Sequence, residues 1–186
     1  MNDHLLPVGL IGGVEKREIK VVDYDPRWSE KYEQHAKRIK AALKEHLLQV
    51  EHVGSTSVPG LAAKPIIDID VIVEDSSDET TYLPALEKAG YVLRVREPDW
   101  HEHRMMRTPE LDVHVHIFSP DSPEFKRHLV FRDWLRRNTE DRQLYDTTKR
   151  QLAARQWEDM NAYARAKSEV VERIIATALR EMSDTQ

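Results

Sequence analysis

The sequence predicts an α+β fold, in which a mixed β-sheet carries helices on one side and a helical C-terminal region packs against it. Short segments rich in β-branched residues alternate with helical patterns up to residue 120, whereas only helical patterns follow residue 123. The length of 186 residues suits a single globular unit with its own hydrophobic core. We therefore predict an N-terminal arm over residues 1–18, an α/β core over 19–120 and a packed helical region over 121–186.

The first predicted elements follow the arm, whose glycines disfavour regular structure. A short strand is predicted over Ile19–Val22. Asp25 is a suitable N-cap and Pro26 suits the first helical position, so a helix begins here. Apolar side chains at helical spacing extend this helix to about Leu47.

The remaining elements are predicted from β-branched runs, helical periodicity and turn signals. The predicted strands are Val50–Val53, Pro65–Val73, Tyr91–Arg96, His103–Arg107 and Leu111–Phe118. The predicted helices are Thr80–Ala89, which Gly90 ends, and then Phe125–Arg137, Asp141–Trp157 and Asn161–Met182.

Composition excludes several classes of protein. The chain has no cysteine, which excludes thiol catalysis, disulfides, iron–sulfur clusters and cysteine-ligated zinc. The net charge of −5 argues against general nucleic-acid binding. The longest stretch without charged residues, His52–Ala63, is far shorter than the roughly 20 residues of a membrane span. No basic segment precedes the first apolar patch, so we expect no signal peptide and a cytoplasmic protein.

A turn rich in glycine and hydroxyl residues follows the strand predicted at residues 50–53. Gly54 allows a sharp turn and a close approach to a ligand. Ser55, Thr56 and Ser57 offer hydroxyl and N–H groups, which suit a phosphate if a short helix begins here. The alternative is an ordinary Ser/Thr-rich turn without a ligand.

Two carboxylates interrupt the buried strand that follows. Asp68 and Asp70 are two residues apart, so both side chains should lie on the same face of the strand. Neighbouring carboxylates repel each other, and a divalent cation relieves that repulsion. Ligands made only of oxygen favour Mg²⁺ or Mn²⁺. In the alternative, one carboxylate is half exposed and the other pairs with a basic residue such as Lys64 or Arg104.

These motifs resemble a known family. Gly54-Ser55, twelve intervening residues and Asp68-Ile69-Asp70 resemble the signature of the nucleotidyltransferase superfamily related to DNA polymerase β. The segment HVGSTSVPGLAAKPIIDI more closely resembles the core motif of the GrpB (UPF0157) family, and the resemblance extends over residues 19–180. It implies a nucleotidyltransferase-like sheet whose Gly-Ser turn holds a triphosphate and whose Asp-x-Asp pair binds Mg²⁺.

The third metal ligand is left open between an acid and a histidine. Two-metal transfer usually needs a further acid on a neighbouring strand, and Asp112 is the candidate. His114 and His116 lie on the same predicted strand face as Asp112. Either histidine could ligate the metal, act as a base or bind phosphate. The candidate metal ligands are Asp68, Asp70, Asp112 and His116, and the candidate catalytic residues are these four with His114. The segment His101–His103 could extend them to a zinc or iron site, although its spacing is not diagnostic.

Basic and aromatic side chains supply further candidates for phosphate or base binding. Tyr145 and Lys149 share a helix face, as do Tyr163 and Lys167, because each pair is four residues apart. In the alternative, each tyrosine packs in the core and its lysine reaches solvent. The candidate set also includes Lys64 and Arg132, which needs a partner such as Asp68, Asp70 or a phosphate.

Three functions fit these residues. The first is an Mg²⁺- or Mn²⁺-dependent nucleotidyltransferase that binds a nucleoside triphosphate and an unidentified acceptor. The second is a nucleotide- or phosphate-binding module without catalysis. The third is a metal-dependent phosphohydrolase that uses water as its nucleophile.

Overall fold

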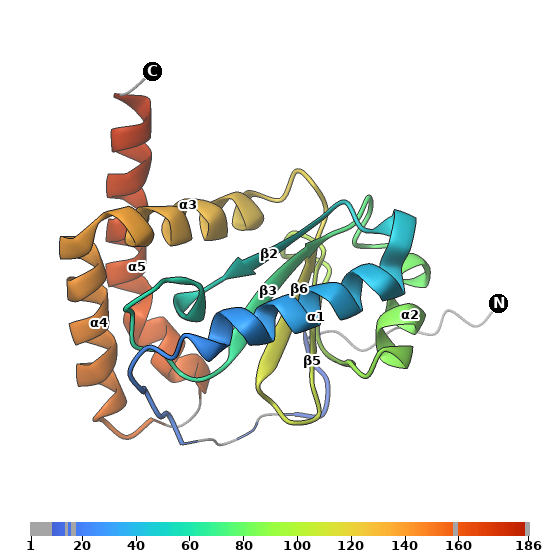
Figure 1. The fold of residues 1–186 in the computed structure, drawn as a ribbon, viewed down its shortest axis with the longest axis horizontal. Helices are drawn as coiled ribbons and strands as arrows, with labels where there is room; N and C mark the ends of the chain where they lie inside the picture. Colours follow the sequence, from blue (N-terminus) through green and yellow to red (C-terminus); the bar gives the residue numbers. More distant parts are fainter. Residues whose placement is uncertain (1–8, 14, 16–17, 158–159, 185–186) are drawn as a thin grey trace.

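The computed structural model describes residues 9–13, 15, 18–157 and 160–184, and it has the predicted α+β fold (Figure 1). In this part of the chain, six strands form one mixed sheet with the order β1-β4-β5-β6-β3-β2. Strands β3 and β6 are parallel, and every other neighbouring pair is antiparallel. The strands are β1 (Gly9–Leu10), β2 (Gln49–Val53), β3 (Ile67–Ile72), β4 (Val92–Glu97), β5 (His103–Arg107) and β6 (Val113–Phe118).

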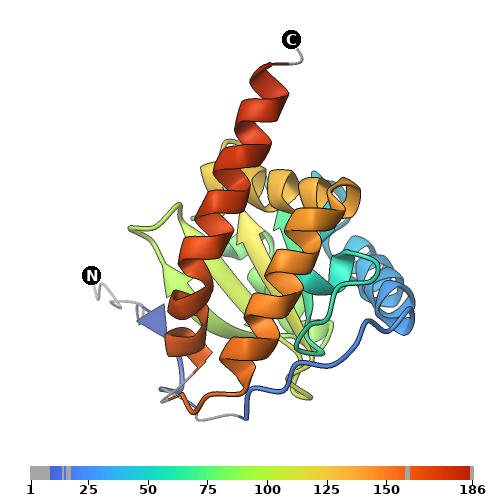
Figure 2. The same cartoon turned by 90° about the vertical axis from the view of Figure 1, so that its left-hand side faces the viewer.

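The helices form two groups. The N-terminal group is α1 (Arg27–Leu43) and α2 (Leu83–Lys88), and the C-terminal group is α3 (Pro123–Arg137), α4 (Thr139–Ala153) and α5 (Met160–Ser183). Figure 2 shows α4 and α5 side by side in front of the sheet. Pro26, not the predicted Asp25, is the N-cap of α1, and the carboxylate of Asp25 accepts a 2.9 Å hydrogen bond from the N–H of Arg27. No described helix has the length and apolar character needed to cross a membrane.

The alternation of side chains along β3 determines what faces each group of helices. Ile67, Ile69 and Val71 are buried in the main core, together with Trp28 and Ile39 of α1. The intervening positions face the C-terminal helices, where Ile72 packs against Phe118 and Phe125. The carboxylates of β3 therefore lie between the sheet and α3 to α5.

A second hydrophobic cluster fixes the turn after β2 to the C-terminal helices. Val58 and Leu61 of that turn are completely buried against Trp134, Leu135 and Ile174. Burial of this apolar surface holds the turn and the three helices in a defined arrangement. The polar residues between them are consequently positioned by packing on both sides.

Two predictions about the N-terminal segment were wrong. Ile19–Val22 forms no strand, because Val22 makes only an isolated bridge with Ala63. Pro65, two residues further along the partner segment, has no N–H to continue such pairing. Gly9–Leu10, expected to be irregular, pairs with β4 as the edge strand β1.

The helix predicted at residues 80–89 is interrupted. A 3₁₀ turn over Glu79–Thr81 comes first, and α2 begins only at Leu83. Glu79 accepts hydrogen bonds of 2.6 Å from the Nε atoms of both Arg96 and Arg104, so this turn is held to the sheet. That contact also occupies Arg104, which the sequence offered as a partner for the β3 carboxylates.

Candidate functional site

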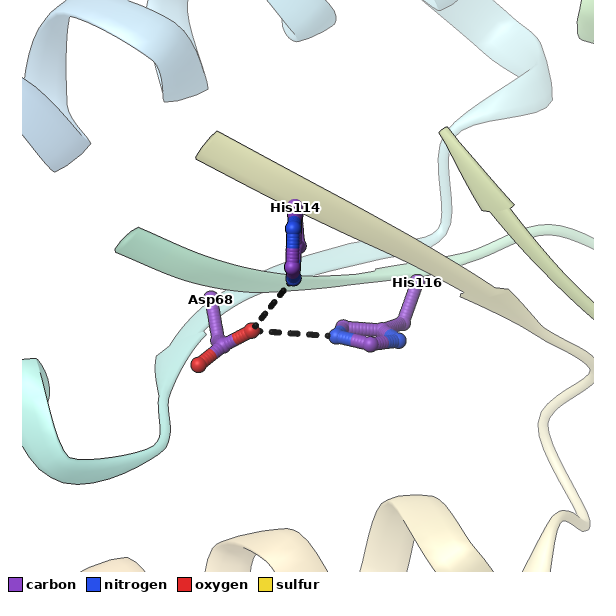
Figure 3. Close-up of side chains that lie close together, drawn as sticks. All are labelled: Asp68, His114 and His116. Carbon is purple, nitrogen blue, oxygen red and sulfur yellow. Dashed lines mark hydrogen bonds and ion pairs between the residues drawn. The ribbon is translucent and has the colours of Figure 1, made fainter. Parts of the chain in front are cut away.

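Asp68, His114 and His116 form a compact cluster on the sheet face that carries the C-terminal helices. The parallel register of β3 and β6 places Asp68 opposite His114 and Asp70 opposite His116. Asp68 Oδ1 lies 3.2 Å from His116 Nε2 and 3.7 Å from His114 Nδ1 (Figure 3). One potential ligand atom from each of the three residues lies within 4.8 Å of the other two.

The charge of Asp68 is maintained by its neighbours. Burial by itself would raise the pKa of Asp68, but the hydrogen bond from His116 and the charges of His116, His114 and Lys64 lower it to about 2. The carboxylate is therefore ionised at neutral pH. Its side chain is 31% exposed, and those of the two histidines are 19% and 20% exposed, so a small ligand can approach the cluster.

The donor atoms of this cluster fit a divalent cation, although not the oxygen-only set expected for Mg²⁺. One carboxylate oxygen and two imidazole nitrogens suit a cation that accepts both kinds of donor, such as Mn²⁺ or Zn²⁺, better than Mg²⁺. If a cation binds there, the histidines would contribute two of the three donor atoms, and Asp68 would contribute the only carboxylate of the cluster.

A buried histidine supports His116 from behind. His103 Nε2 lies 3.1 Å from His116 Nδ1, and His103 Nδ1 lies 2.7 Å from Glu97 Oε2. Burial, together with the nearby charges of His116 and His128, lowers the pKa of His103 to about 2, so this imidazole is neutral. Its Nδ1–H donates to Glu97, and its Nε2 accepts the Nδ1–H of His116. These two hydrogen bonds orient the His116 ring so that its Nε2 faces Asp68. Outer hydrogen bonds commonly orient metal-binding histidines in this way.

Asp70 does not join the cluster, contrary to its predicted role as a metal ligand. Its carboxylate is completely buried and accepts a 2.7 Å hydrogen bond from Nδ1 of His128 in α3. Its other oxygen, Oδ1, has no hydrogen-bond partner among the described residues. The predicted alternative, in which one aspartate pairs with a basic residue, therefore applies to Asp70, with His128 as the partner.

His128 is held as a cation by two carboxylates. Burial would lower its pKa, but the hydrogen bonds to Asp70 and Glu124 raise it to about 10. Glu124 Oε1 lies 3.4 Å from His128 Nε2, one helical turn away on α3. Neither His128 nor Glu97 was predicted from the sequence. The four-residue spacing between Glu124 and His128 was a signal that could have drawn attention to His128.

Asp112, the candidate third acid, also lies outside the cluster. Its carboxylate accepts hydrogen bonds from Lys31 of α1 and, at 2.7 Å, from the Thr108 hydroxyl. Leu111 has a φ of 64°, and Asp112 precedes the first residue of β6. The alternation of strand side chains therefore does not extend to Asp112, and the prediction that it shares a face with His114 was wrong.

The turn after β2 is shaped around Asp68. Gly54 has φ 70° and ψ −174°, and a Cβ atom there would lie 2.7 Å from Asp68 Oδ2. The hydroxyl of Ser57 donates to the carbonyl of Gly54 at 2.5 Å, and that of Thr56 lies 2.9 Å from His52 Nε2. The turn continues as a single 3₁₀ turn over Ser55–Ser57. Gly54 thus makes room for the carboxylate, while Thr56 and Ser57 use their hydroxyls within the fold.

We expect Gly54→Ala to displace the Asp68 carboxylate and weaken divalent cation binding. The backbone conformation is one that essentially only glycine adopts, at a cost of about 1–3 kcal/mol for other residues. Gly60→Ala is the matched control, because Gly60 also has a positive φ but has no atom within 4 Å of the added Cβ. Both variants should be less stable in urea unfolding, and only Gly54→Ala should lose Mn²⁺ affinity in calorimetry. Equal Mn²⁺ affinities in the two variants would contradict the assigned contact.

A basic pocket adjoins the cluster. It has a volume of about 120 Å³, and its lining includes Ser55, Lys64, Asp68, His114, Lys149, Tyr163 and Lys167. The Nζ atom of Lys149 donates to the Ala62 carbonyl and lies 4.6 Å from the centre of the Tyr145 ring. Lys64 and Lys167 lie 5.1 and 4.8 Å from the centre of the Tyr163 ring. Both lysines of the predicted Tyr/Lys pairs, together with Tyr163, thus line one pocket, which we call the lysine pocket.

Burial disfavours the protonated form of two lysines that line the lysine pocket. Burial, followed by the charge of Lys167, lowers the pKa of Lys149 to about 6. Burial also lowers the pKa of Lys167. The Tyr163 hydroxyl is buried and has no hydrogen-bond partner among the described residues. Lys149 is itself only 2% exposed, so its predicted alternative as a solvent-directed lysine was wrong.

Arg132 belongs to neither the cluster nor the lysine pocket, contrary to its predicted phosphate-binding role. Its Nη1 donates to Glu51 at 2.7 Å and to the His52 carbonyl at 3.0 Å, and its Nε donates to Asp133 at 2.8 Å. The partner that this arginine needs is therefore on β2, and it links α3 to the sheet.

Comparisons with known proteins agree with the predicted resemblance. The model of the family described as GrpB protein matches residues 18–177. A UPF0157 protein of Halalkalibacterium halodurans is 54% identical over 160 residues, which are 86% of this chain and 82% of that protein. A protein of Mycolicibacterium paratuberculosis named dephospho-CoA kinase is 29% identical over 180 residues, which are 83% of this chain and 44% of that protein. The crystal structure of a conserved protein GrpB from Enterococcus faecalis matches with a TM-score of 0.76 and 37% identity, covering 88% of this chain and 99% of that one.

Proposed function

The chain belongs to the GrpB family, and from this premise we propose that it binds a nucleoside triphosphate with a divalent cation and transfers the nucleotidyl group to an acceptor hydroxyl, with release of pyrophosphate. One observation carries this proposal. Asp68 and His114 line the same pocket as Lys64, Lys149 and Lys167, so a cation site and an anion site share a wall. A phosphate chain that binds a divalent cation satisfies both sites at once.

The cluster and the lysine pocket would bind different parts of the ligand. Asp68, His114 and His116 would hold the cation, for which Mn²⁺ is the better probe and Mg²⁺ the comparison. When bound, such a cation supplies charge neutralisation to the phosphate oxygens. Lys149 and Lys167 would meet the remaining phosphate charge, and an anion bound beside Lys149 would favour the protonated form that burial disfavours.

The chemistry that follows depends chiefly on positioning. Phosphoryl and nucleotidyl transfer need an aligned attacking oxygen and neutralised phosphate charge more than covalent help from the protein. Among the described residues, no other carboxylate joins Asp68 in the cluster. The cluster therefore fits one cation better than the two cations of the superfamily pattern. The name of the Mycolicibacterium relative, dephospho-CoA kinase, also belongs to phosphate-transfer chemistry.

Hydrolysis is a second candidate, favoured by the composition of the cluster. Two imidazoles and one carboxylate are also the ligands of sites that activate water as a nucleophile. With α-phosphate-labelled ATP and Mn²⁺, hydrolysis yields labelled AMP and pyrophosphate. Transfer places the label on another product, and binding without either product supports a non-catalytic module.

Lys149→Met tests the phosphate site directly. We expect it to weaken binding of ATP in the presence of Mn²⁺ by about tenfold to hundredfold, since a hydrogen bond to a charged group contributes about 1.5–3 kcal/mol. Lys126→Met, at an exposed position of α3, is the matched control and should bind ATP as the unsubstituted protein does. Calorimetry gives the affinities. Unchanged ATP binding by a folded Lys149→Met protein would remove the lysine pocket from the proposal.

A further inference from the structure

A second, mostly apolar pocket lies on the other side of the cluster, between α3, α5 and the sheet. It has a volume of about 260 Å³, and its apolar walls are formed by Val53, Phe131, Tyr145, Val171 and Ile175. The rings of Phe131 and Tyr145 lie 5.2 Å apart at an interplanar angle of 80°, so one presents its edge to the other. We call this cavity the apolar pocket.

The metal-ligand cluster stands at the boundary between the two pockets. Asp68 lines both of them, His114 lines the lysine pocket and His116 lines the apolar pocket. Gly54 lines the apolar pocket, and Ser55, the next residue, lines the lysine pocket. A molecule held at Asp68 can therefore extend into both pockets, one basic and one apolar.

The charges around the apolar pocket do not suit a second phosphate. Glu124 is ionised, because its hydrogen bond with His128 lowers its pKa against the effect of burial. The two cationic groups on this rim are engaged: Arg127 contacts Glu124 and Glu172, and His128 bonds Asp70. What remains open is a surface of aromatic and branched aliphatic side chains, which matches a flat apolar group.

We propose that the apolar pocket binds the base of the nucleotide whose phosphates occupy the lysine pocket. The inference rests on the proposed function, because it takes the phosphate chain to lie against Lys149 and Lys167. It goes beyond that function by assigning the base to Phe131, Tyr145 and Val171, on the C-terminal helices. The nucleotide then spans the cluster, with the phosphate nearest its sugar at Asp68.

The test compares two nucleotides with a ligand that lacks the sugar and the base assigned to the apolar pocket. ATP and UTP carry a base, and inorganic tripolyphosphate carries only the phosphate chain. With Mn²⁺ present, the unsubstituted protein should bind the better nucleotide about tenfold to hundredfold more tightly than tripolyphosphate, as expected when a base packs on aromatic side chains. Val171→Trp fills the pocket and should reduce nucleotide affinity to that of tripolyphosphate, whose own affinity stays unchanged.

Two further variants keep the test decisive. Phe131→Ala removes a ring without filling the pocket and should also weaken only nucleotide binding. Leu179→Trp makes a comparable change at an exposed position further along α5 and should alter neither ligand. The inference is overturned if the unsubstituted protein binds tripolyphosphate as tightly as the nucleotides, or if Phe131→Ala leaves nucleotide affinity intact. Loss of turnover alone, with nucleotide affinity intact, would assign the pocket to the acceptor instead.

The outcomes separate this inference from the function on which it rests. If tripolyphosphate binds and depends on Lys149 but the base adds nothing, the phosphate site stands and the assignment of the apolar pocket fails. If neither nucleotide nor tripolyphosphate binds in the presence of Mn²⁺, the proposed function fails first and this inference falls with it.

Discussion

Asp68→Asn is expected to lower the Mn²⁺ affinity of the protein by at least about 100-fold, because changes to the groups behind metal ligands already cost about 10–100-fold. The substitution preserves the shape of the side chain and removes the only negative charge of the cluster. His114 and His116 remain, but two imidazoles alone attract a divalent cation far less than a set that includes a carboxylate. Calorimetric titration with Mn²⁺ measures the change.

Asp112→Asn is the matched control for this prediction. It makes the same chemical change just before the strand that carries both histidines, but Asp112 bonds Lys31 and Thr108. Its Mn²⁺ affinity should equal that of the unsubstituted protein. Equal losses in the two variants, or an unchanged affinity in a folded Asp68→Asn protein, would remove Asp68 from the metal site.

His128→Ala is expected to destabilise the protein by about 3–5 kcal/mol, the cost of breaking a buried ion pair by removing one partner. The substitution leaves the carboxylate of Asp70, which has no exposed surface, without its 2.7 Å hydrogen bond. Urea unfolding measures the loss. The double substitution Asp70→Asn and His128→Ala should recover much of it, and His101→Ala, at an exposed histidine, should change little. A similar loss in the single and double variants would show that packing, not charge, is responsible.

The same pair predicts how stability depends on pH. His128 has its pKa raised from 6.5 to about 10 in the folded state, so folding favours its protonated form. Its stabilising contribution is complete below pH 6.5 and is lost progressively as the pH rises from 6.5 to about 10. The difference in unfolding free energy between the unsubstituted protein and His128→Ala should therefore narrow across this range. A difference that stays constant between pH 7 and pH 10 would show that His128 is not held as a cation.

Local patterns predicted the parts of the site that depend on regular geometry. Alternation along β3 correctly indicated that Asp68 and Asp70 lie on one face of the strand, since Ile67 and Ile69 fill the main core on the other face. The four-residue spacing of the Tyr/Lys pairs correctly placed each pair on one helix face, because α4 and α5 are regular at those positions.

The errors arose where one residue's conformation or partner depends on the tertiary structure. Asp112 follows Leu111, whose left-handed conformation ends the alternation that the prediction assumed. Arg132 has a carboxylate partner as expected, but that partner is Glu51 on β2, which no local pattern identifies. His128 is a single residue on a helix, and only the packing of α3 on the sheet brings it to Asp70.

Gly54 shows how a correct local prediction can have a different cause. The sequence analysis expected a glycine at a sharp turn that approaches a ligand. The turn is present, but the group that requires the absence of a Cβ atom is the Asp68 side chain. A long-range contact between the turn and β3, which the sequence does not reveal, sets the requirement.

The central claim is that Asp68, His114 and His116 bind one divalent cation beside a phosphate chain. A crystal structure of the protein with Mn²⁺ and a non-hydrolysable nucleoside triphosphate, with anomalous scattering measured at the manganese edge, tests it most directly. We predict one anomalous peak in contact with all three side chains and with a phosphate oxygen, and a phosphate chain that reaches Lys149 and Lys167. A peak on Asp70 or Asp112, or an ordered nucleotide with no manganese at Asp68, would contradict the claim.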